Sequence, residues 1–195
     1  MASLKNYYHI KLLIAPALIM LFISAANGQV KDTIIKNIRK TCQKINTDNT
    51  LKTIYLENDE IPGEPTDGGS SLSGFVRVKT ICKMDFWIGL SYCIRQYSYY
   101  LNDNGQLVFI YETERDFPED KQRGLKHSRT VLAFEGRYYL DNGQVIDTKL
   151  KGKKRMGKNP SAKDIADLVS DAKTYVKLLS DRIKNNSQLT HILKK

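Results

Sequence analysis

The sequence predicts an α+β domain in which two amphipathic helices flank a run of antiparallel strands. Three observations support this: apolar residues recur at helical spacing near both ends, alternating apolar segments fill the middle, and Asn-Gly turns join successive segments. Strands joined by short turns are antiparallel. We therefore expect a single β-meander of about five or six strands, with the N-terminal and C-terminal helices packed on one face.

The chain begins with the pattern of a secretory signal peptide. Lys5 and Lys11 precede an apolar run from Leu12 to Ile23, and small residues follow up to Gly28. The run is shorter than the roughly 20 residues of a membrane-spanning helix. We expect residues 1–28 to be a signal peptide that is removed, which leaves an exported, soluble protein, periplasmic or secreted, with no integral membrane segment.

One domain is expected to follow the signal peptide. We place it at residues 29–186, and we expect residues 187–195 to be a frayed tail. The 195-residue chain carries 31 basic and 21 acidic residues, a net charge of +10. A surplus of this size favours polyanions without specifying one, so no specific nucleic-acid binding is expected.

The first helix is predicted at residues 32–46, with Asp32 as its N-cap. Apolar residues recur there at three- and four-residue steps, and Cys42 lies on the apolar side. A short strand is expected at residues 53–57. Gly, Pro, Ser and acidic residues then predict a loop at residues 58–74.

The middle of the chain is predicted to be β-structure. Residues 74–84 alternate apolar and basic side chains and are predicted to form one strand. Further strand segments, rich in Tyr, Ile, Val and Phe, are residues 90–101, 107–113, 130–140 and 144–150. Residues 161–184 predict the second helix, because Ser161 and Asp164 have the spacing of a capping box; Asn185-Asn186 is expected to end it.

Two predicted hairpins repeat the same residues. Tyr99-Tyr100-Leu101 precedes Asn-Asp-Asn-Gly-Gln-Leu, and Tyr138-Tyr139-Leu140 precedes Asp-Asn-Gly-Gln-Val. Together with the signal peptide and the N-terminal helix, this pattern resembles a large set of small exported bacterial proteins of unassigned function, over about residues 31–150. The resemblance implies no catalytic residues.

The three cysteines are Cys42, Cys82 and Cys93, and an oxidising compartment permits a disulfide between two of them. If the chain turns near Trp87, Cys82 and Cys93 face each other across a hairpin within bridging distance. We expect a Cys82–Cys93 disulfide, with a bond from Cys42 as the alternative. No zinc-ligand spacing occurs, so no metal site is expected.

The sequence contains no His-Glu-x-x-His, Gly-x-Ser-x-Gly or phosphate-loop motif. We therefore expect a non-enzymatic binding or interaction protein without a cofactor. The alternative is an exported hydrolase whose site is assembled across the sheet and the acidic loop.

The predicted recognition surface combines a Tyr-rich sheet face with a basic edge. Its partner would be a protein, a peptide or a glycan. The opposing interpretation is that the tyrosines fill a packed sheet and the basic run is a solvated connector. The candidate residues are Tyr97, Tyr99, Tyr111 and Tyr138 from the strands, and Lys151, Lys153, Lys154 and Arg155 from the basic run.

Overall fold

A computed structural model describes residues 28–63, 66–120, 124–156 and 159–192, with side chains in the last range described up to Asn185. The predicted signal peptide therefore lies, apart from Gly28, outside the described residues. The chain divides into two units, residues 1–40 and residues 41–195. In the first unit, the described residues 28–40 are helical. Within the described ranges, no helix has the length and apolar character needed to cross a membrane.

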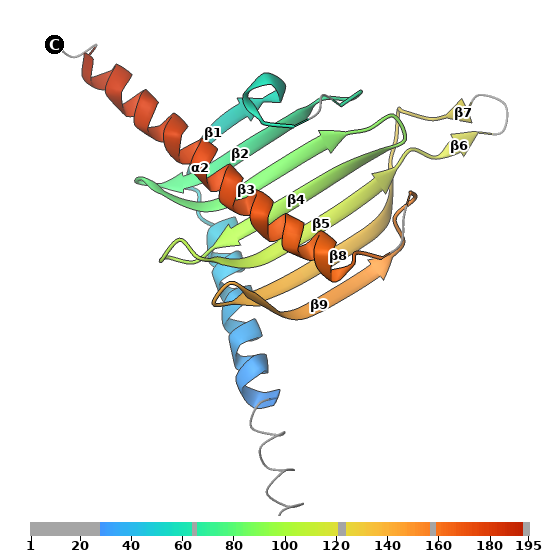
Figure 1. The fold of residues 1–195 in the computed structure, drawn as a ribbon, viewed down its shortest axis with the longest axis horizontal. Helices are drawn as coiled ribbons and strands as arrows, with labels where there is room; N and C mark the ends of the chain where they lie inside the picture. The colour runs from blue at the N-terminus through green and yellow to red at the C-terminus, as the bar shows by residue number, and fades with distance from the viewer. Residues whose placement is uncertain (1–27, 64–65, 121–123, 157–158, 193–195) are drawn as a thin grey trace, which may run out of the picture. The chain divides into compact units, whose positions relative to one another are not determined.

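The larger unit is built on a seven-stranded antiparallel sheet (Figure 1). A separate two-stranded hairpin, β6 (Glu119–Asp120) and β7 (Gly124–Leu125), is inserted in the chain between β5 and β8. The protein is α+β, as predicted, with more strands than the five or six expected. In order across the sheet, the strands are β1 (Lys52–Glu57), β2 (Ser70–Arg77), β3 (Thr80–Gly89), β4 (Cys93–Leu101), β5 (Leu107–Asp116), β8 (Val131–Asp141) and β9 (Gln144–Gly152).

The additional strand comes from residues 74–84, which were predicted to be one strand. The structure divides this segment between β2 and β3, because the chain reverses at Val78-Lys79 and Arg77 pairs with Thr80. Val78 adopts a φ of +58° and is 93% exposed. A β-branched residue rarely takes this conformation, so residue preferences do not reveal the turn.

The turn between β3 and β4, at residues 90–92 and not near Trp87 as expected, decides whether the cysteines meet. β3 continues past Trp87, and Lys83 pairs with Tyr100 near the end of β4. Cys82 therefore lies beside the end of β4, whereas Cys93 begins that strand, which separates them by roughly 25 Å at 3.3 Å per residue. All three cysteines are free thiols. The predicted Cys82–Cys93 disulfide is not formed.

Helix α2 (Ala162–Ile192) crosses one face of the sheet diagonally (Figure 1). It begins as predicted: the Ser161 backbone N–H donates to Asp164 Oδ2 at 2.7 Å, and the Asp164 N–H donates to Ser161 Oγ at 3.2 Å. It continues through Asn185-Asn186 to Ile192, so the predicted end is wrong. Asn costs only a fraction of a kcal/mol inside a helix and does not stop one by itself.

The core lies between α2 and the sheet. Tyr175 and Leu179 of α2 are buried against residues such as Leu72, Met84 and Tyr99. We call this side of the sheet the α2 face, and the other side, which carries Tyr100 and Tyr111, the opposite face. Successive strand residues alternate between the two faces.

The end of the first helix, residues 41–46, packs on the opposite face and not beside α2. Residues 28–46 are helical, so Asp32 lies within the helix instead of capping it. The part that belongs to the larger unit begins at residue 41, and its Ile45 packs against Cys82 and Tyr100. The prediction that both helices pack on one face is therefore wrong, because the central strands are apolar on both sides and can hold a helix on each.

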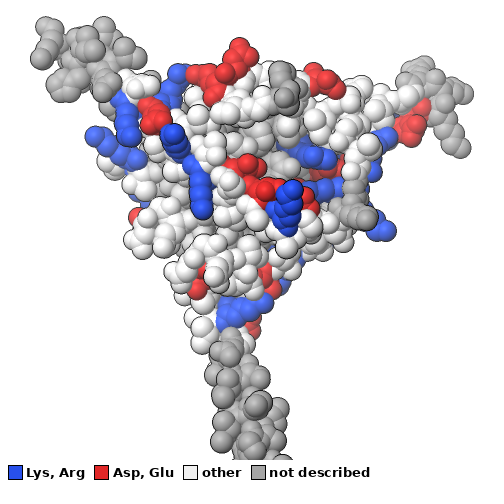
Figure 2. All heavy atoms as spheres, in the orientation of Figure 1, with Lys and Arg blue, Asp and Glu red and all other residues white. Residues whose placement is uncertain are grey.

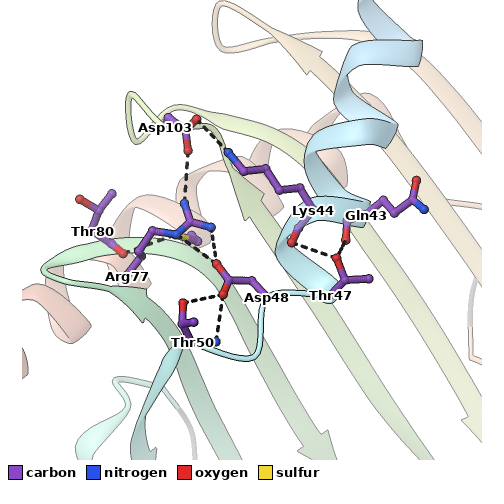
Figure 3. Close-up of polar contacts among 9 residues, drawn as sticks. Gln43, Lys44, Thr47, Asp48, Thr50, Arg77, Thr80 and Asp103 are labelled. Atoms are coloured by element: carbon purple, nitrogen blue, oxygen red, sulfur yellow. Dashed lines mark hydrogen bonds and ion pairs between the residues drawn. The ribbon is translucent and has the colours of Figure 1, made fainter.

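Polar contacts attach the end of this helix to the sheet (Figure 3). Arg77 Nη2 donates to Asp48 Oδ2 at 2.6 Å, and Arg77 Nη1 lies 3.5 Å from Asp103 Oδ1 in the β4–β5 turn. Thr50 donates to Asp48 through both its hydroxyl and its backbone N–H. These hydrogen bonds, from Thr50 first and then Arg77, lower the pKa of Asp48 to about 2.

The two repeated hairpins place their tyrosines alike but differ in their turns, since Leu101 pairs with Leu107 in the first and Asp141 pairs with Gln144 in the second. In each, the first tyrosine faces α2, the second faces the opposite side, and a register shift separates the second tyrosine from a buried leucine. The second hairpin turns at Asn142 and Gly143, whose φ angles of +49° and +78° are those that Asn-Gly was predicted to supply. The equivalent residues are Tyr99, Tyr100 and Leu101 in the first hairpin and Tyr138, Tyr139 and Leu140 in the second.

Candidate functional site

The four candidate tyrosines do not share one surface. Tyr97, Tyr99 and Tyr138 lie on the α2 face, and Tyr111 lies on the opposite face. Tyr99 is 1% exposed and meets the Tyr175 ring edge-on, with the ring centroids 5.7 Å apart. Tyr138 is fully buried. Of these residues, Tyr111 is the one that the structure places on a face not covered by α2.

Tyr138 belongs to a buried polar group on the α2 face. Its hydroxyl donates to Glu112 Oε2 at 2.8 Å, and Lys154 Nζ lies 2.5 Å from Glu112 Oε1. Burial, together with the neighbouring Glu112 charge, raises the pKa of Tyr138, so the phenol stays protonated. Gly136 leaves the room that this ring needs, since a Cβ there would lie 2.6 Å from the Tyr138 hydroxyl.

A second buried carboxylate, Glu114, is also held by basic groups. Arg95 Nε donates to Glu114 Oε2 at 2.7 Å, and the Arg155 backbone N–H donates to Glu114 Oε1 at 2.7 Å. The Arg155 guanidinium donates onward to the Phe117 carbonyl at 3.1 Å. Both oxygens of this fully buried carboxylate therefore have partners, as buried charges require.

The basic run consequently divides into two parts. Lys151, Lys153 and Arg155 are exposed, whereas the Lys154 ammonium turns inward to Glu112. Arg155 reaches Glu114 with its backbone N–H only. Figure 2 shows Lys and Arg interspersed with Asp and Glu on the α2 side, not gathered into one basic field. Part of the predicted basic edge therefore makes internal contacts that hold the chain in place just before α2.

Cys93, Glu114 and Asp116 bring three possible metal-ligand atoms within 4.8 Å of one another. Burial raises the pKa of the Cys93 thiol to about 11, and burial followed by the Glu114 charge raises that of Asp116. Both Glu114 oxygens are already committed to Arg95 and Arg155. We therefore assign this cluster to the internal charge network and not to a metal site.

The opposite face carries a pocket of about 280 Å³ over β3, β4, β5 and the start of β8. Two rows of side chains cross it, because Asp85 pairs with Ser98, which pairs with Tyr111, while Trp87 pairs with Gln96, which pairs with Thr113. Arg115 and Leu132 complete the lining. The pocket thus combines aromatic rings with hydrogen-bonding groups of both kinds.

Asp85 is the least satisfied group in this pocket. Its Oδ2 accepts a hydrogen bond from Lys83 Nζ at 2.8 Å. Its Oδ1 is buried and has no hydrogen-bond partner within the described part of the chain. A buried acceptor without a donor is unusual in a folded protein, so this oxygen is available to a donor that enters the pocket.

Tyr111 is held in place at the other end of the same row. Its hydroxyl donates to Glu135 Oε1, which also accepts from Arg137 Nη2 at 3.0 Å, and the Arg137 guanidinium lies 5.5 Å from the Tyr111 ring centroid. The Tyr111 hydrogen bond and then the Arg137 charge lower the pKa of Glu135 against the effect of burial. The ring therefore has a fixed orientation at the edge of the pocket.

Among the residues that line the pocket, sequence reasoning identified Tyr97 and Tyr111 and missed the others. Trp87 was expected at a turn, and Asp85, Gln96 and Arg115 were not singled out. The sequence did contain one signal for these residues, because every second residue of a strand lies on the same face. This holds for residues 85 and 87, for 96 and 98, and for 111, 113 and 115. It becomes informative only after the β3–β4 register is known.

Comparisons of this chain with protein-family models, with curated proteins and with solved structures give no match.

Proposed function

We propose that the protein is an exported, non-enzymatic binding module that recognises a glycan in the pocket on the opposite face. The observation that carries this proposal is the unpartnered Asp85 Oδ1 beneath a pocket that also contains Trp87 and Tyr111. Export rests on the signal-peptide pattern of residues 1–28.

The chemistry of the pocket suits a hydroxyl-rich ligand. A sugar hydroxyl can donate to Asp85 Oδ1, and the Arg115 guanidinium and the Gln96 amide can donate to sugar oxygens. The Trp87 and Tyr111 rings offer apolar surface to the C–H faces of a sugar ring. A mixed lining of this kind supports a glycan better than a purely apolar ligand.

The alternative, an exported hydrolase acting across the sheet and the acidic loop, has less support. Glycoside hydrolysis commonly uses two carboxylates that flank the scissile bond. Among the described residues lining this pocket, Asp85 is the one carboxylate. In the acidic loop, Asn58 accepts a hydrogen bond from the Ser70 N–H and Glu60 pairs with Arg182, so both are engaged in packing the loop.

The test is a glycan array probed with the purified protein, followed by calorimetry on the best ligand. We expect Asp85→Ala to weaken binding at least about tenfold, which is roughly 1.4 kcal/mol. Asp181→Ala, which removes an exposed carboxylate on α2, is the matched control and should bind normally. Equal binding by Asp85→Ala and the native chain would refute the pocket, and turnover of the bound glycan would favour the hydrolase.

A further inference from the structure

An apolar groove runs along α2 on the α2 face of the sheet, separate from the proposed glycan pocket. It consists of two pockets of about 460 Å³ and about 430 Å³, and both are lined by Gly143 and Val169. The shared residues make the two pockets adjoining parts of one groove. The repeated hairpins form one wall, and the side of α2 forms the other.

The floor of the groove is made by the sequence repeat. Leu101 and Leu140 occupy equivalent positions in the two hairpins, and both line the larger pocket together with Leu107. Ala172 and Val176 face them from α2. In Figure 2, the surface below α2 on the side of the hairpin ends is mostly free of charged residues. The groove therefore exposes apolar surface to water, which is unfavourable.

The groove has a polarity along α2. Its first part is lined by Ala162, Ala166 and Val169, and the helix wall then continues through the exposed Lys173 to Val176. From Ala162 to Lys173 the helix rises roughly 16 Å, the extended length of an acyl chain of about a dozen carbons. Lys177, also exposed, follows one turn later on the same side.

We propose that this groove binds a free medium-chain fatty acid. The chain lies along Ala162, Ala166 and Val169 over the hairpin leucines, and the carboxylate lies at Lys173. The Lys173 charge selects an anionic head group, and the distance from Ala162 to Lys173 along α2 selects a chain of about a dozen carbons. This site is independent of the glycan pocket, because the two lie on opposite faces of the sheet.

Binding of dodecanoate to the full chain, measured by calorimetry, tests the proposal, with dodecylammonium as the cationic counterpart. We expect dodecanoate to bind and Lys173→Glu to weaken it at least about tenfold. The same variant should bind dodecylammonium better than the native chain does. Lys163→Glu makes the same charge change at another exposed position of α2 and should bind dodecanoate normally.

A second pair of variants tests the apolar part without disturbing the core. Ala166→Trp places a large ring in the groove from an exposed helix position and should abolish dodecanoate binding. Thr174→Trp adds the same ring at an exposed position outside the groove and should bind normally. Undiminished binding by Ala166→Trp would overturn the proposal.

Two other occupants are outcomes of the same experiment. If the native protein is a dimer that dodecanoate does not dissociate, and Ala166→Trp is a monomer, the groove holds a second copy and the fatty-acid proposal fails. The proposal also fails if dodecanoate does not bind and an amphipathic peptide binds to the native chain but not to Ala166→Trp. The glycan assay is unaffected by either result, so the two proposals can fail separately.

Discussion

The two faces of the sheet treat polar groups in different ways. On the α2 face, Glu112 and Glu114 are buried; Lys154 pairs with Glu112, and Arg95 and the Arg155 backbone N–H donate to Glu114. Asp116 Oδ1, beside Glu114, is buried without a hydrogen-bond partner among the described residues, but it lines none of the pockets described above. On the opposite face, Asp85 has one paired oxygen and one buried oxygen without a partner. Satisfied buried charges stabilise one arrangement of the chain, whereas an unsatisfied acceptor beside a pocket is a place for a ligand. The pocket beside Asp85, together with the oxygen that has no partner, marks the opposite face as the candidate binding face.

The largest expected difference between the faces is in the unfolding free energy that is lost when a carboxylate is removed. Glu114→Ala leaves Arg95 half-buried without its partner and should lower the free energy of unfolding by about 3 kcal/mol. Asp85→Asn, on the opposite face, should change it by less than about 1 kcal/mol, because the pair with Lys83 is partly exposed. Urea unfolding of both variants measures the two losses of unfolding free energy. Equal losses would show that the two faces do not differ in this respect.

A smaller difference is expected between two tyrosine hydroxyls. Tyr138→Phe removes a buried hydrogen bond to Glu112 and should cost about 2 kcal/mol of unfolding free energy. Tyr111→Phe removes a partly exposed hydrogen bond to Glu135 and should cost less than about 1 kcal/mol. Thermal and urea unfolding give both values. A greater loss of unfolding free energy for Tyr111→Phe would contradict the conclusion that the more stabilising hydrogen bond lies on the α2 face.

The smallest effect concerns the partly exposed ion pair between Asp48 and Arg77 on the opposite face. The folded-state pKa of Asp48 is about 2, below the ordinary value of 3.8, so its contribution to stability is present above pH 4. It is lost as the pH falls through 2. We expect the native chain to lose more stability between pH 4 and pH 2 than Asp48→Asn, measured by urea unfolding at each pH. Parallel pH profiles would show that Asp48 contributes nothing.

Much of the fold could be predicted from local patterns. The Ser161 and Asp164 capping box, the Asn142-Gly143 turn and the alternation of the later strands all appear where they were expected. These features depend on residues close together in the sequence. The turn at Val78 could not be predicted, because its conformation is imposed by the pairing of β2 with β3 against the preference of the residue.

The candidate site was less predictable than the fold. Tyr111 was identified, but three of the four tyrosines lie on the face that α2 covers, and Asp85 and Trp87 became neighbours of Tyr111 only through strand register. The expected disulfide is absent because the chain turns between β3 and β4 at residues 90–92 and not near Trp87, which places Cys82 and Cys93 at opposite ends of the strand pair. Which face a strand residue occupies, and which residues lie across from it, are properties of pairing and not of composition.

By itself, the sequence determined the α+β class, the antiparallel pairing through Asn-Gly turns and the start of α2, because these follow from the conformational preferences of adjacent residues. Only the tertiary structure decided that residues 41–46 pack on the face opposite α2, that Lys154 turns inward to Glu112 and that a pocket forms over Asp85. Those outcomes depend on contacts between residues far apart in the sequence. A buried charge requires a partner, and an apolar sheet face must be covered by another element.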